Sequence, residues 1–198
     1  MHTAIFTTIA LTMALVTNLS IANTITPNEH FKIEDPADIS AEEAEALYQS
    51  IINRMRNGYA HSDYLAAKQY SRWTRFNDQP YLSAGHGNRY LSNYGNRIAS
   101  NYLDLQPGEQ MAKGAIIAKD SFTAKKDGTL LPGALFLMEK LDSGVKTEYG
   151  DWRYVMVLPD GAVLGDSEGA NAQSMHFCHT CHVAVQSTDY LFFLPEKK

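Results

Sequence analysis

The feature that most constrains this chain is a short motif near its carboxyl end that contains both of its cysteines: Phe177-Cys178-His179-Thr180-Cys181-His182. Two cysteines separated by two residues and followed directly by histidine are the attachment signature of a c-type haem. The thiols of Cys178 and Cys181 add across the haem vinyl groups, and His182 is then held beneath the iron as an axial ligand. The sequence therefore predicts one covalent haem c per chain.

The same cysteine spacing has two other uses in proteins. Cys-x-x-Cys also occurs in thiol redox sites of the thioredoxin type and in zinc clusters. Zinc needs further ligands, and the chain has no second pair of cysteines. A dithiol protein without haem is the alternative that stays open.

Length and charge narrow the class of protein. The chain has 198 residues and 44% of them are hydrophobic, so one domain can bury a core without disulfide staples. The net charge of -5 argues against a nucleic-acid partner, whose phosphates call for a basic face. The same charge suits a basic redox partner, such as a soluble cytochrome that accepts electrons.

The first part of the chain has the pattern of an export signal. Residues 4–16 are all apolar or threonine, and Ser20-Ile21-Ala22 has small residues where a signal peptidase cuts, so we expect a signal peptide over residues 1–22. No lysine or arginine precedes Lys32, which is a departure from the usual signal. A membrane anchor is the rival interpretation, but the apolar stretch would form a helix of roughly 20 Å, shorter than a hydrocarbon core of about 30 Å. A periplasmic or otherwise exported protein without a stable membrane span is predicted.

Helical patterns follow a polar linker over residues 23–39. Ser40 and Glu43 form a capping box, and apolar residues then recur at steps of three and four down to Asn57-Gly58. Aromatic residues at helical spacing predict further helices over residues 63–76 and 90–102.

Alternating patterns follow the helical ones and predict strands. The apolar runs cover residues 115–122, 134–139 and 152–158, with a short fourth strand near Val163. Turn residues between the runs favour an antiparallel meander. The haem motif opens a helix that runs to about residue 187. The predicted fold class is thus α+β, with a haem domain over residues 40–198 in which a β-meander packs against N-terminal helices and a C-terminal haem-binding helix.

The late position of the motif bears on the second axial ligand of the iron. Little of the chain follows His182, so a sixth ligand has to come from upstream. The candidate methionines all sit in apolar patterns typical of core residues: Met55, Met111, Met138, Met156 and Met175. We therefore expect an iron that is open on one face and binds small molecules there.

Several segments together resemble the cytochrome P-460 family and its relative cytochrome c-prime-beta. They are residues 86–90, 114–122, 135–140, 150–154 and 177–182, with 191–195 behind them. The resemblance implies a small antiparallel sheet packed with helices, often as a homodimer, with the haem against one face of the sheet. In P-460 members a strand lysine is bonded to a haem ring carbon, and Lys119 matches that position.

The local pattern around Lys119 bears on whether its side chain is buried and able to react. Alternation places its side chain on the face of Ala115 and Ile117. If that face is buried, the amine is costly as an ion and nucleophilic when neutral. If the other face is buried, Lys119 is an ordinary solvated lysine.

The resemblance also implies a reaction, the oxidation of hydroxylamine to nitric oxide or nitrous oxide at the open iron. A buried carboxylate would help as a base, and Glu139 is the better candidate, with Glu168 second. Arg89 and Arg153 are candidates to bind the haem propionates or to form surface ion pairs.

Three functions stay open for a haem-bearing chain. The first is a hydroxylamine-oxidising enzyme, which needs the Lys119 cross-link, an open iron and an electron acceptor. The second is a protein that binds nitric oxide or another small gas, in the manner of cytochrome c-prime-beta, with an uncrosslinked haem and an apolar wall. The third is a periplasmic electron carrier with a methionine as sixth ligand.

Overall fold

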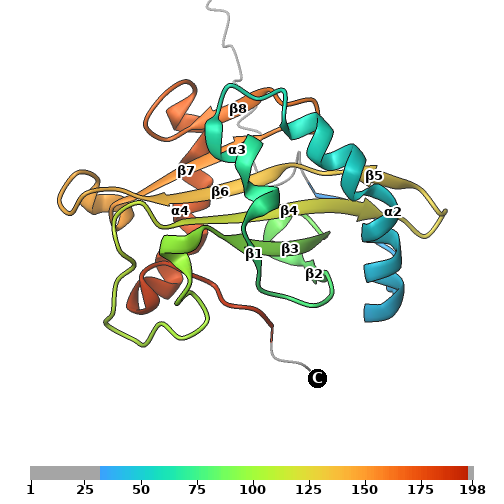
Figure 1. Cartoon of the computed structure of the whole chain (residues 1–198), viewed down its shortest axis with the longest axis horizontal. Coiled ribbons are helices and arrows are strands. Elements are labelled where there is room, and N and C mark those ends of the chain that lie inside the picture. Colours follow the sequence, from blue (N-terminus) through green and yellow to red (C-terminus); the bar gives the residue numbers. More distant parts are fainter. Residues whose placement is uncertain (1–31, 196–198) are drawn as a thin grey trace, which may run out of the picture.

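The computed structural model describes residues 32–195, so the predicted signal peptide and residues 23–31 of the linker lie outside the described residues. Its centre is one antiparallel sheet with the strand order β1-β3-β4-β6-β7-β8; β2 also pairs with β3, and β5 with β4 (Figure 1). The strands are β1 Thr74–Arg75, β2 Tyr81–Ser83, β3 Arg89–Gly95, β4 Ile116–Ala124, β5 Leu130–Pro132, β6 Leu135–Lys140, β7 Trp152–Val157 and β8 Val163–Asp166. The predicted α+β class and antiparallel sheet are confirmed.

Helices cover both faces of this sheet (Figure 1). The α-helices are α2 Ala41–Tyr59, α3 Leu65–Gln69 and α4 His176–His182. The 3-10 helices are η1 Tyr70–Arg72, η2 Ala84–His86, η3 Arg97–Ala99, η4 Thr147–Tyr149, η5 Ala172–Met175 and η6 Val183–Thr188. None of the helices between residues 32 and 195 is long and apolar enough to cross a membrane.

Helix α2 packs on one face of the sheet. It begins as predicted at Ser40, whose hydroxyl oxygen accepts a hydrogen bond of 3.2 Å from the Glu43 backbone N–H. The helix then buries a stripe of side chains against the sheet: Ala44, Tyr48, Ile51, Ile52, Met55 and Tyr59. Burial of this stripe fixes which residues of the central strand face α2.

Strand β4 is buried on both of its faces. Ala118 and Phe122 belong to the core under α2, whereas Ile117 belongs to a second core on the opposite face. Because side chains alternate along a strand, Lys119 shares the face of Ile117 and points away from α2. That face is the one that α4 and the chain's last described residues cover.

The predicted helix over residues 90–102 is wrong. Strand β3 occupies Arg89–Gly95, and only the short η3 turn follows. Tyr90 and Tyr94 are four residues apart, a spacing that fits one face of a helix and equally one face of a strand. Both tyrosines are buried in the core under α2, and strand pairing decides between the two readings.

The second predicted helix, over residues 63–76, is shorter than expected. The structure has α3 at Leu65–Gln69, followed by η1 and then by strand β1. Strand β1 pairs with the end of β3, so tertiary pairing overrides the helical pattern there. The haem-motif helix is likewise split into α4 and the tighter η6.

Candidate haem site

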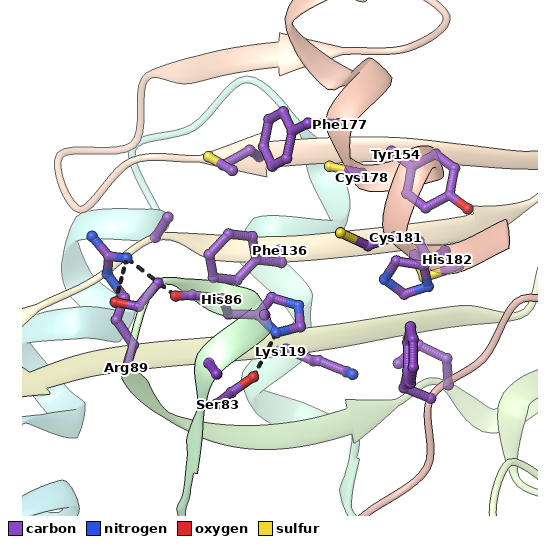
Figure 2. Close-up of a pocket in the computed structure, with 18 of the residues that line it drawn as sticks. Ser83, His86, Arg89, Lys119, Phe136, Tyr154, Phe177, Cys178, Cys181 and His182 are labelled. Carbon is purple, nitrogen blue, oxygen red and sulfur yellow. Dashed lines mark hydrogen bonds between the residues drawn. The ribbon is translucent and has the colours of Figure 1, made fainter. Parts of the chain in front are cut away.

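A cavity of about 610 Å³ lies between the sheet and helix α4. Its lining is mainly apolar and comes from β4, β6, β7, the η2 turn, α4 and the segment around Phe192 and Phe193. A cavity of this size, lined mainly by apolar groups with a few polar ones, is typical of a cofactor site. Figure 2 shows the labelled polar side chains of this cavity converging from separate segments of the chain.

Helix α4 brings the three motif residues to the cavity. Cys178, Cys181 and His182 all line it, because residues three and four apart lie on one side of a helix. Cys178 is partly buried and Cys181 is exposed, and both thiols are free. The predicted attachment residues and the predicted axial ligand are therefore brought together at one wall.

His182 is oriented by its surroundings. Its Nδ1 lies 2.6 Å from the carbonyl oxygen of Tyr190, and because a carbonyl can only accept, Nδ1 carries the proton and donates. Its ring meets the rings of Tyr154 and Phe192 edge to face. Burial, and then the nearby charge of Lys119, lower the pKa of His182 to about 4. The imidazole is neutral at pH 7, and its Nε2 is the nitrogen left to bind a metal.

The environment of Cys178 argues against the dithiol alternative. Burial raises the pKa of the Cys178 thiol to about 12. Reactive thiols of redox sites have a lowered pKa, because the thiolate is the nucleophile. Within residues 32–195 no three His, Cys, Asp or Glu side chains are grouped to hold a metal ion, so this part of the chain offers the motif no partners for a zinc cluster.

Lys119 points into the cavity from the middle of β4 (Figure 2). It is only 6% exposed, and its neighbours across the sheet are Asn93 and Phe136. Burial lowers the pKa of the Lys119 amine to about 8. Among the described residues, no carboxylate pairs with it. The interpretation of Lys119 as a solvated surface lysine is therefore wrong.

His86 is a site residue that the sequence analysis did not single out. It enters the cavity from the η2 turn, with Nδ1 2.9 Å from the Ser83 hydroxyl and its ring edge-on to Phe136 at 4.8 Å between centroids (Figure 2). Burial lowers the pKa of His86 well below its usual value, and the charges of Lys119 and His182 add to the effect. His86 is therefore a neutral imidazole on the cavity wall.

The structure corrects the expected role of Glu139. This carboxylate is on β6, but it shares the face of Leu137 and accepts hydrogen bonds from Tyr64 (2.7 Å) and Arg153 (3.3 Å). Tyr64 packs against the core under α2, on the side of the sheet opposite the cavity. Glu139 therefore lies on the face that α2 covers and does not line the cavity.

The other candidates of the sequence analysis divide between the two faces. Arg153 binds Asp166 beside Glu139, so it forms an ion pair away from the cavity. Glu168 pairs with Lys146 at 2.9 Å. Arg89 does line the cavity and can meet an anionic group there. Of the methionines considered, Met138 and Met156 line the cavity, whereas the remaining three do not.

Comparison with known families identifies the class of protein. The family model described as Cytochrome P460 matches residues 63–193. The chain belongs to the cytochrome P460 family, and it is a c-type haem protein. A search of the curated proteins finds no match to this chain.

The residues of the cavity fit a haem on structural grounds. The lining is mainly apolar, as a macrocycle requires, and two free thiols and a neutral imidazole with an available Nε2 lie on one wall. The buried hydroxyl of Tyr154 also lines the cavity and has no hydrogen-bond partner among the described residues. A buried polar group of this kind needs a partner, and a ligand in the cavity can supply it.

Proposed function

We propose that this chain oxidises hydroxylamine at a haem c that Cys178 and Cys181 bind covalently and His182 ligates, with Lys119 bonded to a haem ring carbon. The observation that carries the proposal is the place of Lys119, a buried amine on the wall of the cavity that also contains the haem motif. The haem would supply an iron that accepts electrons from the substrate and passes them to an external acceptor such as a soluble cytochrome. The remaining steps depend on side chains of this chain.

The buried environment makes the Lys119 amine suitable for bonding to carbon. With a pKa of about 8, roughly one amine in ten is neutral at pH 7, against about one in three thousand for an ordinary lysine. Only the neutral amine has the lone pair that such a bond requires. An amine N–H and a ring C–H are lost as the C–N bond forms, and the two electrons released have to pass to an external oxidant. Phe136, opposite Lys119 on the neighbouring strand, presents an apolar ring to the same part of the cavity. These features support the cross-linked form.

His86 supplies the base that we had expected from a carboxylate. Oxidation of hydroxylamine releases protons as well as electrons, so a proton acceptor beside the substrate is needed. When Nδ1–H of His86 donates to the Ser83 hydroxyl, Nε2 is free to accept a proton from the cavity. The lowered pKa keeps this imidazole neutral before the proton arrives. His86 thus takes the role first assigned to Glu139.

Binding of nitric oxide or another small gas is the second candidate, and the apolar lining favours it. Ile117 and Phe136 present apolar surface in the same cavity, which would hold a diatomic gas even without the Lys119 bond. An electron carrier would need a sixth ligand, for which Met138 and Met156 are the methionines on the cavity wall. The three functions differ in the state of Lys119 and in turnover of hydroxylamine.

The proposal is tested by mapping the haem peptides of the purified holoprotein. We expect protease digestion followed by mass spectrometry to give a haem joined to two peptides, one with residues 178–182 and one with Lys119. In the Lys119→Met variant the haem should be joined to the motif peptide alone, and hydroxylamine oxidation should be abolished. Lys126→Met, which removes an exposed lysine beyond the end of the same strand, is the matched control and should change neither.

Two results would contradict the proposal. A haem held by the motif peptide alone, with no oxidation of hydroxylamine, would leave gas binding as the function. A preparation matured with the c-type machinery that never carries haem would refute the whole account of the site.

A further inference from the structure

A buried ion pair lies beneath the segment that orients His182. Lys140, the last residue of β6, places its Nζ 2.5 Å from Oδ1 of Asp189, and their side chains are 5% and 1% exposed. Each partner makes one further hydrogen bond: Lys140 also donates to the Gly150 carbonyl at 2.9 Å, and Asp189 accepts from the Met111 N–H at 2.8 Å. Buried pairs are costly to form, so such a pair calls for a function beyond stability.

Asp189 is the first of two residues with an unusual backbone. Asp189 has φ 53° and Tyr190 has φ 64°, both in the left-handed region that residues other than glycine seldom adopt. Two such residues in a row persist only where the surroundings hold them. The ion pair holds the Asp189 side chain, and the Trp152 indole N–H donates to the Asp189 carbonyl at 2.8 Å.

A glycine holds the same turn from the other side. Gly150 packs so closely under the Tyr190 ring that a Cβ there would lie 2.0 Å from a ring carbon. The carbonyl of Gly150 is the one that Lys140 binds. Lys140 therefore connects the two segments that enclose Tyr190, and the turn has little freedom to move.

The turn matters because it sets the direction of the Tyr190 carbonyl, which accepts a hydrogen bond from His182. The Tyr190 carbonyl accepts the Nδ1–H of His182 at 2.6 Å. Such a hydrogen bond to the outer nitrogen of a metal-binding histidine fixes its ring orientation and raises its strength as a donor. Any shift of the 189–190 turn changes this bond directly.

We infer that the Lys140–Asp189 pair is a positioning device for the axial histidine: it fixes the left-handed turn whose carbonyl orients His182 and sets how strongly His182 donates to the iron. This inference rests on the proposed function in one respect, that His182 ligates the haem. Neither partner lines the cavity, so both act through the Tyr190 carbonyl. They are positioning residues and not catalytic ones.

The test uses the ferrous holoprotein and reads the iron–histidine bond itself. The variants are Lys140→Met, which removes the charge, Asp189→Asn, which keeps the size, and Lys140→Arg, which restores the charge. Lys113→Met is the matched control, because it breaks an exposed ion pair in the same part of the fold, Lys113–Asp142 at 2.6 Å, and leaves the buried pair intact. Resonance Raman spectroscopy gives the iron–histidine stretching frequency, and redox titration gives the midpoint potential.

We expect Lys140→Met and Asp189→Asn to lower the stretching frequency or split the band. A weaker donor stabilises ferric iron less, so the midpoint potential should rise by an amount corresponding to a roughly tenfold change in the redox equilibrium, which is about 59 mV for one electron. Lys140→Arg should recover part of the shift, and Lys113→Met should show none. A purely structural pair would lower stability and leave the stretching frequency unchanged.

The outcomes separate this inference from the proposed function. An unchanged band and potential in Lys140→Met and Asp189→Asn would overturn the positioning role while leaving the function intact. Absence of an iron–histidine band from a five-coordinate ferrous haem in the wild-type protein would instead refute ligation by His182. If Lys140→Met does not fold, Asp189→Asn, which differs in charge but hardly in size, decides the question.

Discussion

Asp120 offers a prediction whose size can be worked out from the structure. It follows Lys119 on β4 and points to the opposite face, where the hydroxyls of Tyr48 and Tyr70 donate to its Oδ2 at 2.7 and 3.1 Å. The residue is fully buried, and its Oδ1 has no hydrogen-bond partner among the described residues. We predict that Asp120→Asn changes how stability depends on pH.

The sign of the change follows from proton binding in the two states. Burial raises the pKa of Asp120 from 3.8 to about 7. Between these values the folded chain keeps the proton and the unfolded chain releases it, so the free energy of unfolding falls as the pH rises. A difference of about 3 in pKa corresponds to about 4 kcal/mol across this window. Asparagine has no proton to release and removes this contribution.

The assay is guanidinium unfolding of wild-type and Asp120→Asn holoprotein from pH 4 to pH 8, followed by far-ultraviolet circular dichroism. Other titrating groups are common to both proteins, so they cancel in the difference between the two stability curves. Relative to wild type, the variant should gain about 4 kcal/mol of stability between pH 4 and pH 8. Parallel curves would show that Asp120 does not keep its proton in the folded chain, and would refute the reasoning.

Three further variants test the fold and the site. Ser40→Ala should lower the free energy of unfolding by about 1 kcal/mol, because the first turn of α2 loses its cap; an unchanged denaturation midpoint would show that the cap contributes nothing. Cys178→Ala combined with Cys181→Ala should leave the haem extractable by acidified solvent, and haem that stays with the polypeptide would contradict thioether attachment. His86→Phe should slow hydroxylamine oxidation by about 10²-fold while nitric oxide still binds; an unchanged kcat would remove His86 from the proton path.

The fold was predictable where one pattern fitted one structure. The run around Ile117 reads as a strand, and the stripe after Ser40 reads as a helix. The segment from Tyr90 was misread because its tyrosine spacing fits both a helix and a strand. Only pairing with β4, which is a long-range contact, decides between them.

The spacing of the haem motif predicted part of the candidate site, whereas the alternation of the strands predicted which residues enter the cavity less well. The motif residues needed only their spacing, and alternation correctly grouped Lys119 with Ile117. The run from Leu135 is apolar on both faces, so its pattern does not tell whether the face with Glu139 is the one that meets the cavity. His86 carries no local signal, because its turn reaches the cavity only through tertiary packing.

The absorption spectrum of the reduced holoprotein, together with the response of the oxidised form to hydroxylamine, tests the central claim most directly. We predict a Soret band shifted far to the red of ordinary c-type haem, as the proposed bond between Lys119 and the ring requires, and a spectral change with hydroxylamine that leads to turnover. A sharp low-spin spectrum that responds to neither hydroxylamine nor nitric oxide would contradict the account and indicate an electron carrier.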